Sequence, residues 1–190
     1  MDADAAPVNR LMQVSVEALF PAFYGAAETA SAARHIARVD LTLIADGTYL
    51  VYEEAGVIVA CGGWSRRGRL YTGSAAHEGD ERLLDPATDA AHVRAMFVRP
   101  DRTRRGLGRA ILEAAEAAAR AEGFGRLDLM ATLPGVPLYR AFGFREIERV
   151  QITMPDGVTI AGVVMDQGRR ISMLAASPVV EGWERRGSGP

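Results

Sequence analysis

The sequence predicts an α+β protein with one mixed, mostly antiparallel sheet flanked by helices in α/β/α-type layers. Three observations lead to this fold class. Two stretches of helical periodicity precede any clear strand, hairpin patterns occur at 48–64 and 147–165, and a strand–helix–strand run lies between them at 92–132. No internal repeat or linker divides the chain. We therefore expect one domain over residues 1–170 and a partly disordered extension over 171–190.

The composition is typical of a globular protein in water and argues against several function classes. The chain has 190 residues, of which 48% are hydrophobic and 24% charged, so it can bury a core. A formal net charge of −2 gives no general attraction to nucleic acid or to an acidic membrane. Cys61 is the only cysteine, which excludes an internal disulfide and gives no support for a zinc site. The sequence shows no basic segment followed by an apolar one and no long apolar run, so we expect a cytoplasmic protein. We also expect no bound metal.

Two helices are expected first. Residues 4–20 carry apolar side chains at helical spacing until Pro21 breaks the pattern. An alanine-rich run over 26–37 predicts the second helix. Both come before the first segment with strand character.

A hairpin and a long loop are expected next. Residues 48–54 are rich in strand formers, and Ala55-Gly56 can turn the chain into a second strand over 57–64. The polar segment 65–90 predicts a long loop, which in a compact domain is usually functional or mobile. This loop could act as a lid over a site.

The stretch 103–110 is the strongest candidate for a ligand site. It joins a strand over 92–98 to a helix from about Gly108 to Glu122, which Gly123 is expected to cap. Gly106 and Gly108 allow a tight turn and close approach of a ligand, while the first helical N–H groups are unpaired. Five arginines gather there, at positions 99, 102, 104, 105 and 109. These features predict a site for a ligand with several phosphates, although a solvated basic turn would give the same pattern.

The last predicted elements are a strand, a short helix and a second hairpin. Residues 127–132 alternate as a strand does, and a short helix is expected over 136–142. Strands over 147–154 and 158–165 flank Pro155-Asp156-Gly157, a strong hairpin turn. From Asp166 onward no regular pattern is present, and residues 185–190 resemble a frayed tail.

Four elements in this order resemble the GCN5-related N-acetyltransferase (GNAT) family. They are the strand ending Met96-Phe97-Val98-Arg99-Pro100, the turn from Arg105 to Leu112, the strand to Thr132, and Tyr139-Arg140-Ala141-Phe142-Gly143-Phe144. The resemblance covers about residues 88–148, and the hairpin at 48–64 fits the two preceding strands of the family. It implies an acyl-CoA N-acyltransferase fold and transfer of acetyl from acetyl-CoA to a primary amine by direct attack in a ternary complex. The alternative is a non-catalytic acyl-CoA-binding sensor or scaffold.

The chain departs from the family pattern at three places. By strand spacing, the phosphate motif falls on Thr103, Gly106 and Gly108, so Thr103 replaces the usual glutamine or arginine. A register beginning at Arg105 matches the letters better but fits the strand spacing worse. Thr132 stands where many members have an asparagine, and the family's first strand is missing or very short. Because backbone amides do most of the phosphate binding, we expect the coenzyme site to survive.

The resemblance also implies roles for individual residues. Tyr139 is expected to protonate the departing coenzyme thiolate as general acid. The backbone of Met96, Phe97 and Val98 is expected to pair with the pantetheine arm and to offer an N–H to the thioester oxygen, while Thr132 lies beside that arm. The pyrophosphate is expected on amides of the turn, contributed by Arg104, Arg105, Gly106, Leu107, Gly108 and Arg109.

The acceptor side is left more open. Phe20, Phe23, Tyr24 and Trp64 are the candidate pocket walls, and Arg94 could face the same pocket. A polyamine, an amino acid, an aminoglycoside and a protein amine all remain candidates, with the aromatic walls favouring a small, partly apolar amine. We expect neither nucleic acid nor a membrane as a partner. The chain could form a homodimer.

The general base is also open. It could be His92, Glu28, Glu54 or ordered water, with His77 and His35 as weaker candidates. Cys61 could carry the acetyl group in a covalent scheme, but a single strand cysteine is typical of a small core residue. Direct transfer is therefore the preferred scheme.

Overall fold

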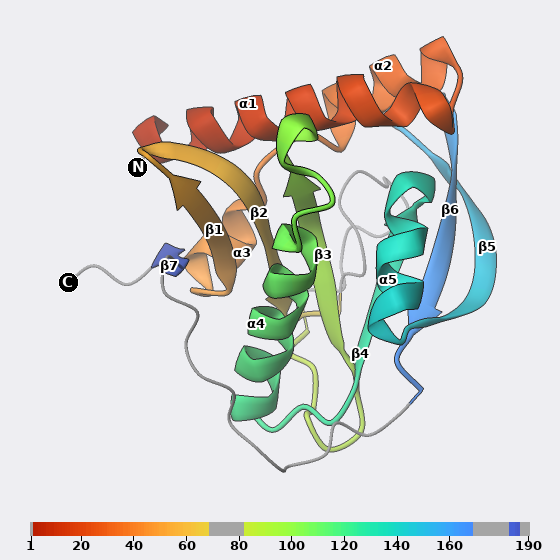
Figure 1. Cartoon of the computed structure of the whole chain (residues 1–190). Coiled ribbons are helices and arrows are strands. Elements are labelled where there is room, and N and C mark those ends of the chain that lie inside the picture. The colour runs from red at the N-terminus through yellow and green to blue at the C-terminus, as the bar shows by residue number, and fades with distance from the viewer. Residues whose placement is uncertain (1, 69–81, 169–182, 187–190) are drawn as a thin grey trace.

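A computed structural model describes residues 2–68, 82–168 and 183–186 and shows a seven-stranded sheet with helices on both faces (Figure 1). All neighbouring strands are antiparallel except β3 and β4, which confirms the predicted mixed, mostly antiparallel sheet. In sheet order the strands are β5 (Arg145–Thr153), β6 (Thr159–Asp166), β4 (Leu127–Thr132), β3 (Ala91–Val98), β2 (Val57–Ser65), β1 (Tyr49–Glu54) and β7 (Trp183–Arg186).

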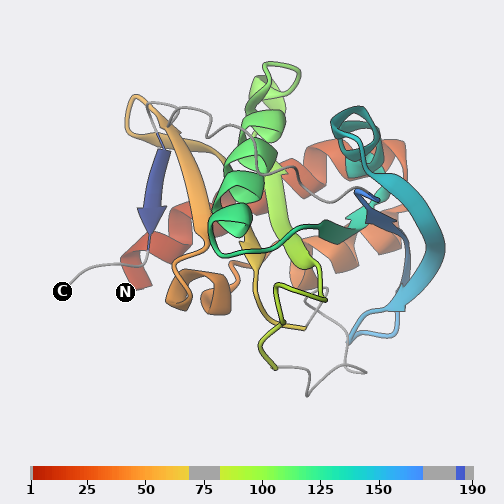
Figure 2. The same ribbon diagram turned by 90° about the horizontal axis from the view of Figure 1, so that it is seen from below.

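The helices divide between the two faces of the sheet (Figures 1 and 2). One face, the α1–α2 face, carries α1 (Asp2–Leu19), the short η1 (Phe20–Ala22), α2 (Ala26–His35) and α3 (Leu41–Ala45). The other, the α4–α5 face, carries α4 (Leu107–Ala121) and α5 (Val136–Phe142). Each face has its own hydrophobic cluster. Met12, Val16 and Leu43 belong to the first, and Leu112, Leu127 and Leu129 to the second.

Amphipathic periodicity explains the two long helices. In α1 the apolar stripe predicted from the sequence is buried, and the helix ends at Leu19, two residues before Pro21. In α4 the side chains of Ile111, Leu112, Ala115 and Ala119 are buried. Gly123 follows α4 with φ +93° and its N–H donates to the carbonyl of Arg120, as expected of a C-terminal glycine.

Both predicted hairpins are present. Ala55 and Gly56 have φ of +48° and +76°, the left-handed conformation at both turn positions that suits a two-residue hairpin. At the second hairpin, the Met154 N–H donates to the Val158 carbonyl at 2.8 Å across the Pro155–Gly157 turn. The sheet therefore grows from two local hairpins joined by β3, α4 and β4.

Two elements were not predicted. The helix α3 begins where the Asp40 carboxylate accepts a hydrogen bond from the Thr42 N–H at 3.0 Å, a side-chain cap on a helix of only five residues. Residues 185 and 186, expected in a frayed tail, belong instead to β7, which pairs with β1. Pairing satisfies backbone groups that β1 would otherwise leave open at the edge of the sheet.

Parts of two predicted segments lie outside the described residues. They are positions 69–81 of the expected loop and positions 171–182 and 187–190 of the expected extension. Among the helices that are described, none is long and apolar enough to cross a membrane.

Candidate functional site

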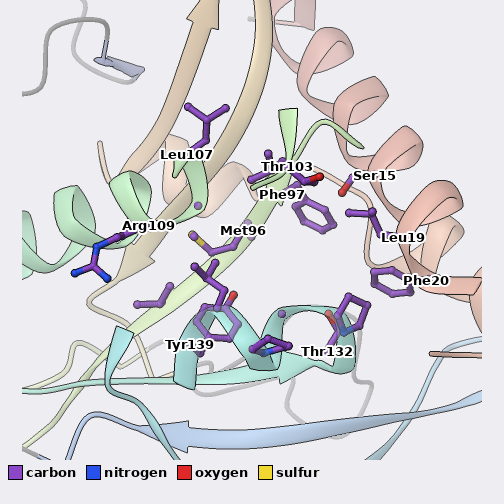
Figure 3. Close-up of a pocket in the computed structure, with 18 of the residues that line it drawn as sticks. Ser15, Leu19, Phe20, Met96, Phe97, Thr103, Leu107, Arg109, Thr132 and Tyr139 are labelled. Carbon is purple, nitrogen blue, oxygen red and sulfur yellow. The ribbon is translucent and has the colours of Figure 1, made fainter. Parts of the chain in front are cut away.

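The sheet opens between its two parallel strands. The pairing of β3 with β4 consists of Ala91 with Leu127 and His92 with Asp128, although β3 continues to Val98 and β4 to Thr132. A cavity of about 580 Å³ occupies the opening. Figure 3 shows Ser15, Leu19 and Phe20 on one side of it, Leu107 and Arg109 on the other, and Met96 and Phe97 between them. Both faces of the sheet thus contribute to one cavity.

A strained turn forms one end of the cavity. Arg104 and Gly106 have φ of +63° and +84°, and α4 begins directly after them at Leu107. In the described structure, the backbone N–H groups of residues 104–109 donate no hydrogen bond to other parts of the protein. Six consecutive free donors at a helix N-terminus make a site for an anion.

Gly108 allows α4 to approach its neighbours. A Cβ atom at this position would lie 2.8 Å from Leu138 Cδ2 of α5 and 3.8 Å from Val98 Cγ2 of β3. The absence of a side chain therefore brings the first turn of α4 against both elements. The predicted requirement for glycine here is explained by packing as well as by ligand approach.

Most of the five arginines at and near the turn form ion pairs with carboxylates. Arg99 binds Asp101, Arg102 binds Glu54 and Asp101, and Arg109 binds Glu113 while its guanidinium lies over the Phe142 ring. Arg104 and Arg105 are exposed and form no ion pair with another described residue. Arg104 lines the cavity and Arg105 does not. One uncommitted guanidinium is therefore available beside the free amides.

Tyr139 lies in α5 with its ring buried against the turn before that helix. A Cβ on Gly135 would lie 2.8 Å from Cε2 of the Tyr139 ring. The Phe144 ring packs edge-on against that of Tyr139, with the ring centroids 5.9 Å apart. The hydroxyl has no hydrogen-bond partner among the described residues, and the residue lines the cavity. Burial raises the pKa of the Tyr139 phenol well above its ordinary value of 10, so the group stays protonated.

A bulge lies in β3 at the centre of the site. Cys61 pairs with Phe97 and Gly63 with Arg94, so Gly62 stands opposite two residues, Ala95 and Met96. Ala95 has φ +55°, which is rare for a residue with a Cβ and recurs at functional sites. Met96, Phe97 and Val98, the predicted coenzyme strand, therefore begin within the bulge and line the cavity.

Residues 14–144 match the model of the Acetyltransferase (GNAT) family. The chain belongs to this family. As a GNAT member it is an acetyl-CoA-dependent acyltransferase. No curated protein matches the sequence.

Several solved GNAT structures share the fold. A GCN5-related N-acetyltransferase of Rhodopseudomonas palustris has a TM-score of 0.64 at 22% identity, with 88% of this chain and 91% of that chain covered. The PaiA N-acetyltransferase of Thermoplasma acidophilum, solved with coenzyme A, has a TM-score of 0.58 at 11% identity, with 87% and 92% covered. The acetyltransferase YncA of Salmonella typhimurium, solved with acetyl-CoA, has a TM-score of 0.56 at 16% identity, with 95% of both chains covered.

Some of the predicted acceptor residues of this GNAT chain reach the cavity and others do not. Phe20 and Arg94 line it. Thr132, which was predicted to lie beside the pantetheine arm, lines it as well. Tyr24 does not. Its hydroxyl donates to the Ala161 carbonyl at 2.7 Å and accepts from the Leu133 N–H at 2.8 Å. Trp64 is buried on the α4–α5 face against Phe124, because its strand position points it away from α1.

Phe23, also predicted as a wall, is exposed and is not among the lining residues. Sequence reasoning missed Ser15, Arg38 and Met154, which do line the cavity. They lie on α1, on the link between α2 and α3, and next to the β5–β6 turn. No motif marks these positions, and only the folded chain brings them together.

The candidate general bases are engaged elsewhere. His92 forms an ion pair with Asp128 where β3 and β4 are still paired, and it does not line the cavity. The carboxylate of Glu28 accepts from the Gly25 N–H, and that of Glu54 binds Arg102.

The other described histidine, His35, offers no base at the cavity. His35 lies 3.2 Å from Asp156, and His77 is outside the described residues. Among the residues that line the cavity in the described structure, none is Asp, Glu or His.

Cys61 is a core residue. It is fully buried in the cluster of the α1–α2 face, and its Sγ lies 3.9 Å from the carbonyl oxygen of Ala95 in the bulge. Burial raises the pKa of its thiol to about 12, which keeps it un-ionised and weakly nucleophilic. In the described part of the chain, no group of three or more His, Cys, Asp and Glu side chains could hold a metal ion.

Proposed function

We propose that this chain transfers the acetyl group of acetyl-CoA to a primary amine by direct attack in a ternary complex. The observation that carries the proposal is the cavity in the opened sheet, which connects the free amides of the 104–109 turn with the buried phenol of Tyr139. A coenzyme with phosphates at one end and a thioester at the other fits this distribution of donors.

The residues of the turn fit the coenzyme's phosphates. Six free N–H groups and the unpaired guanidinium of Arg104 supply donors and positive charge without the loss of an existing bond. Arg109 is already bound to Glu113, so it is the less effective phosphate ligand. Acetyl-CoA supplies the acetyl group when bound.

The backbone of β3 and the phenol of Tyr139 take part in the remaining steps of the reaction. Backbone N–H groups of β3 after the bulge have no β4 partner and can stabilise the oxyanion that forms when the amine attacks the thioester carbonyl. Tyr139 then donates its proton to the sulfur as the carbon–sulfur bond breaks, and the attacking nitrogen releases one proton to water. Water returns a proton to the Tyr139 phenolate, and the amide and free thiol result. The raised pKa of Tyr139 keeps this proton in place until thiolate charge develops.

Removal of the Tyr139 hydroxyl tests the proposal. We expect Tyr139→Phe to lower kcat by about 10²-fold or more, because general acids contribute about 10²–10⁴-fold. The coenzyme dissociation constant and the melting temperature should change little, since the hydroxyl bonds to no described residue. Thiol release from acetyl-CoA with a panel of amines gives the rate, and calorimetry with coenzyme A gives the affinity.

The same assay separates catalysis from simple binding. Coenzyme binding without thiol release for any amine would support a sensor or scaffold and contradict the proposal. Equal rates for wild type and Tyr139→Phe would leave acetyl transfer in place but remove the tyrosine as general acid.

A further inference from the structure

The charges that line the cavity are all of one sign. The charged side chains there are arginines, and in the described structure no acidic side chain joins them. A polyamine or another polycation would meet these guanidinium groups without a carboxylate to bind. Like charges at short range repel, most strongly where water is excluded.

Two of the lining arginines have no carboxylate partner among the described residues, and they come from segments far apart in the sequence. Arg104 is in the turn of residues 104–109, at the start of α4, where the coenzyme phosphates are proposed to bind. Arg38 is on the link between α2 and α3, on the α1–α2 face, and its Nε donates to the Arg34 carbonyl at 2.7 Å. Among the described residues Arg38 forms no ion pair, whereas the buried Arg94 binds Asp40 at 2.6 Å. A second anion can therefore bind at Arg38, in addition to the coenzyme phosphates proposed at Arg104.

The surface between Arg38 and the opening of the sheet is apolar. Phe20 and Met154 belong to the cluster of the α1–α2 face, and Ile36 and Met130 pack against it. These side chains suit a hydrocarbon skeleton. Ser15, only 4% exposed, turns toward the same cavity and has no hydrogen-bond partner among the described residues, so its hydroxyl is free for a polar group of the ligand.

We infer that the acceptor is a small amine with an apolar carbon skeleton and a carboxylate that binds Arg38. The inference rests on the proposed acetyl transfer for the role of the amine. It assigns Arg38 to acceptor recognition and Arg104 to the coenzyme. Polyamines and aminoglycosides are then poor acceptors, because neither offers a carboxylate and both add positive charge to a cationic cavity.

Matched acceptors with and without a carboxylate test the inference. Leucine is compared with 3-methylbutylamine, phenylalanine with phenethylamine, and 5-aminopentanoate with pentylamine, with spermidine as the polycation. In at least one pair we expect the carboxylate to raise kcat/KM by about tenfold or more, since a charged hydrogen-bonded pair exceeds a neutral one. Arg38→Ala should bring that ratio near one, and Arg38→Lys should keep part of it.

Arg34→Ala is the matched control. Arg34 is an exposed arginine one turn earlier that binds Asp156 and does not line the cavity. Its removal should leave both the ratio and the coenzyme affinity unchanged. Arg38→Ala should also leave the affinity for coenzyme A unchanged by calorimetry.

Binding of the products keeps the test independent of turnover. N-acetylleucine and N-(3-methylbutyl)acetamide are titrated into the complex with coenzyme A, with the other two product pairs treated alike. Tighter binding of a carboxylate member, lost in Arg38→Ala, supports the inference even if no amine releases thiol, a result that would overturn the proposed function alone. Equal binding within every pair, the best turnover with spermidine, or an Arg38→Ala defect confined to coenzyme affinity would overturn the inference.

Discussion

At the scale of the residue, the described lining of the cavity offers no side chain whose ordinary pKa is near neutral. Its described lining contains no imidazole or carboxylate, and the pKa of Tyr139 is raised above its ordinary 10. The amine must therefore reach the site unprotonated or lose its proton to water. We expect kcat/KM for the acceptor to rise with pH up to the pKa of the amine itself. Two acceptors with the same skeleton and different amine pKa values should shift the profile accordingly.

The contrary result would be a single inflection near pH 6 to 7 that stays fixed when the acceptor changes. It would assign the base to a histidine or carboxylate away from the described lining. No fall in rate through ionisation of Tyr139 is expected below about pH 10, because burial keeps the phenol protonated there.

Cys61 gives a second prediction at this scale. Because its thiol is fully buried and its pKa is raised to about 12, it should not carry the acetyl group. Cys61→Ala should keep kcat within about twofold and lower the free energy of unfolding by about 1 kcal/mol through lost packing. Initial-rate lines for the two substrates should intersect. Parallel lines in the wild type, together with an inactive Cys61→Ala that still folds, would instead indicate a covalent intermediate.

Motif residues were predicted from the sequence more accurately than pocket walls. Gly106, Gly108 and Tyr139 all line the cavity. Each lies in a local unit, a strand–turn–helix or a short helix, so spacing along the chain locates it. Trp64 was misplaced because a strand shows which residues alternate but not which face receives which helix. Arg38 could not be found, since an exposed arginine in a linking segment has no pattern of its own.

At the scale of the element, the β3 bulge depends on Gly62. A Cβ at this position would lie 2.5 Å from Met96 Sδ and 2.9 Å from Ile111 Cγ2. Gly62→Ala must therefore shift β3 or α4, and we expect it to lower the free energy of unfolding by about 1–3 kcal/mol and to weaken coenzyme binding. Urea denaturation and calorimetry with coenzyme A measure the two effects.

The double variant Gly62→Ala/Met96→Ala is the control for the cause. Since the nearest atom is the Met96 sulfur, a shorter side chain should relieve part of the clash, and the combined cost should be less than the sum of the single costs. Strict additivity would mean that the Met96 side chain is not the source of the cost of Gly62→Ala.

Most elements were predictable because their signals are local. Periodicity and turn residues gave the two long helices and both hairpins within a few residues of their bounds. The helix α3 was missed because five residues are too few to show a period. The bulge at Ala95 was missed because it arises from the mismatch of β3 with β2, two strands more than 25 positions apart in sequence.

At the scale of the whole molecule, several buried phenols and one buried thiol should lower the free energy of unfolding as the pH becomes alkaline. Burial raises the pKa of Tyr24 to about 12 and that of Cys61 to about 12, and it raises those of Tyr49 and Tyr139 as well. The folded state therefore holds these protons more tightly than the unfolded state. Their contribution is complete below about pH 8 and is lost as pH rises toward 12, first for the thiol and then for the phenols, by up to about 1.4 kcal/mol per pH unit for each group.

Urea denaturation at pH 8, 9, 10 and 11 measures this loss. Tyr49→Phe should flatten the decline, because it removes one of the fully buried phenols. Tyr52→Phe, a half-buried tyrosine on the same strand, is the matched control. A free energy of unfolding that stays constant to pH 11 would contradict the expectation.

Long-range contacts limited what the sequence could show about the molecule as a whole. The pairing of β7 with β1 joins segments more than 125 positions apart, and neither has a pattern that specifies the other. The cavity walls likewise combine α1, the α2–α3 link, β3, β4 and α5. Family resemblance implied a mixed, mostly antiparallel sheet flanked by helices, but the walls of the acceptor end depend on how the helices of this chain pack.

The opened sheet also bears on the order of binding and release. The proposed coenzyme ligands lie at the start of α4, whereas Phe20, Ile36 and Arg38, on the proposed acceptor side, line the cavity from the α1–α2 face. Two substrates that approach from opposite faces do not have to pass each other. The kinetic scheme expected of such a protein is random addition, with the acetylated product free to leave before or after the spent coenzyme.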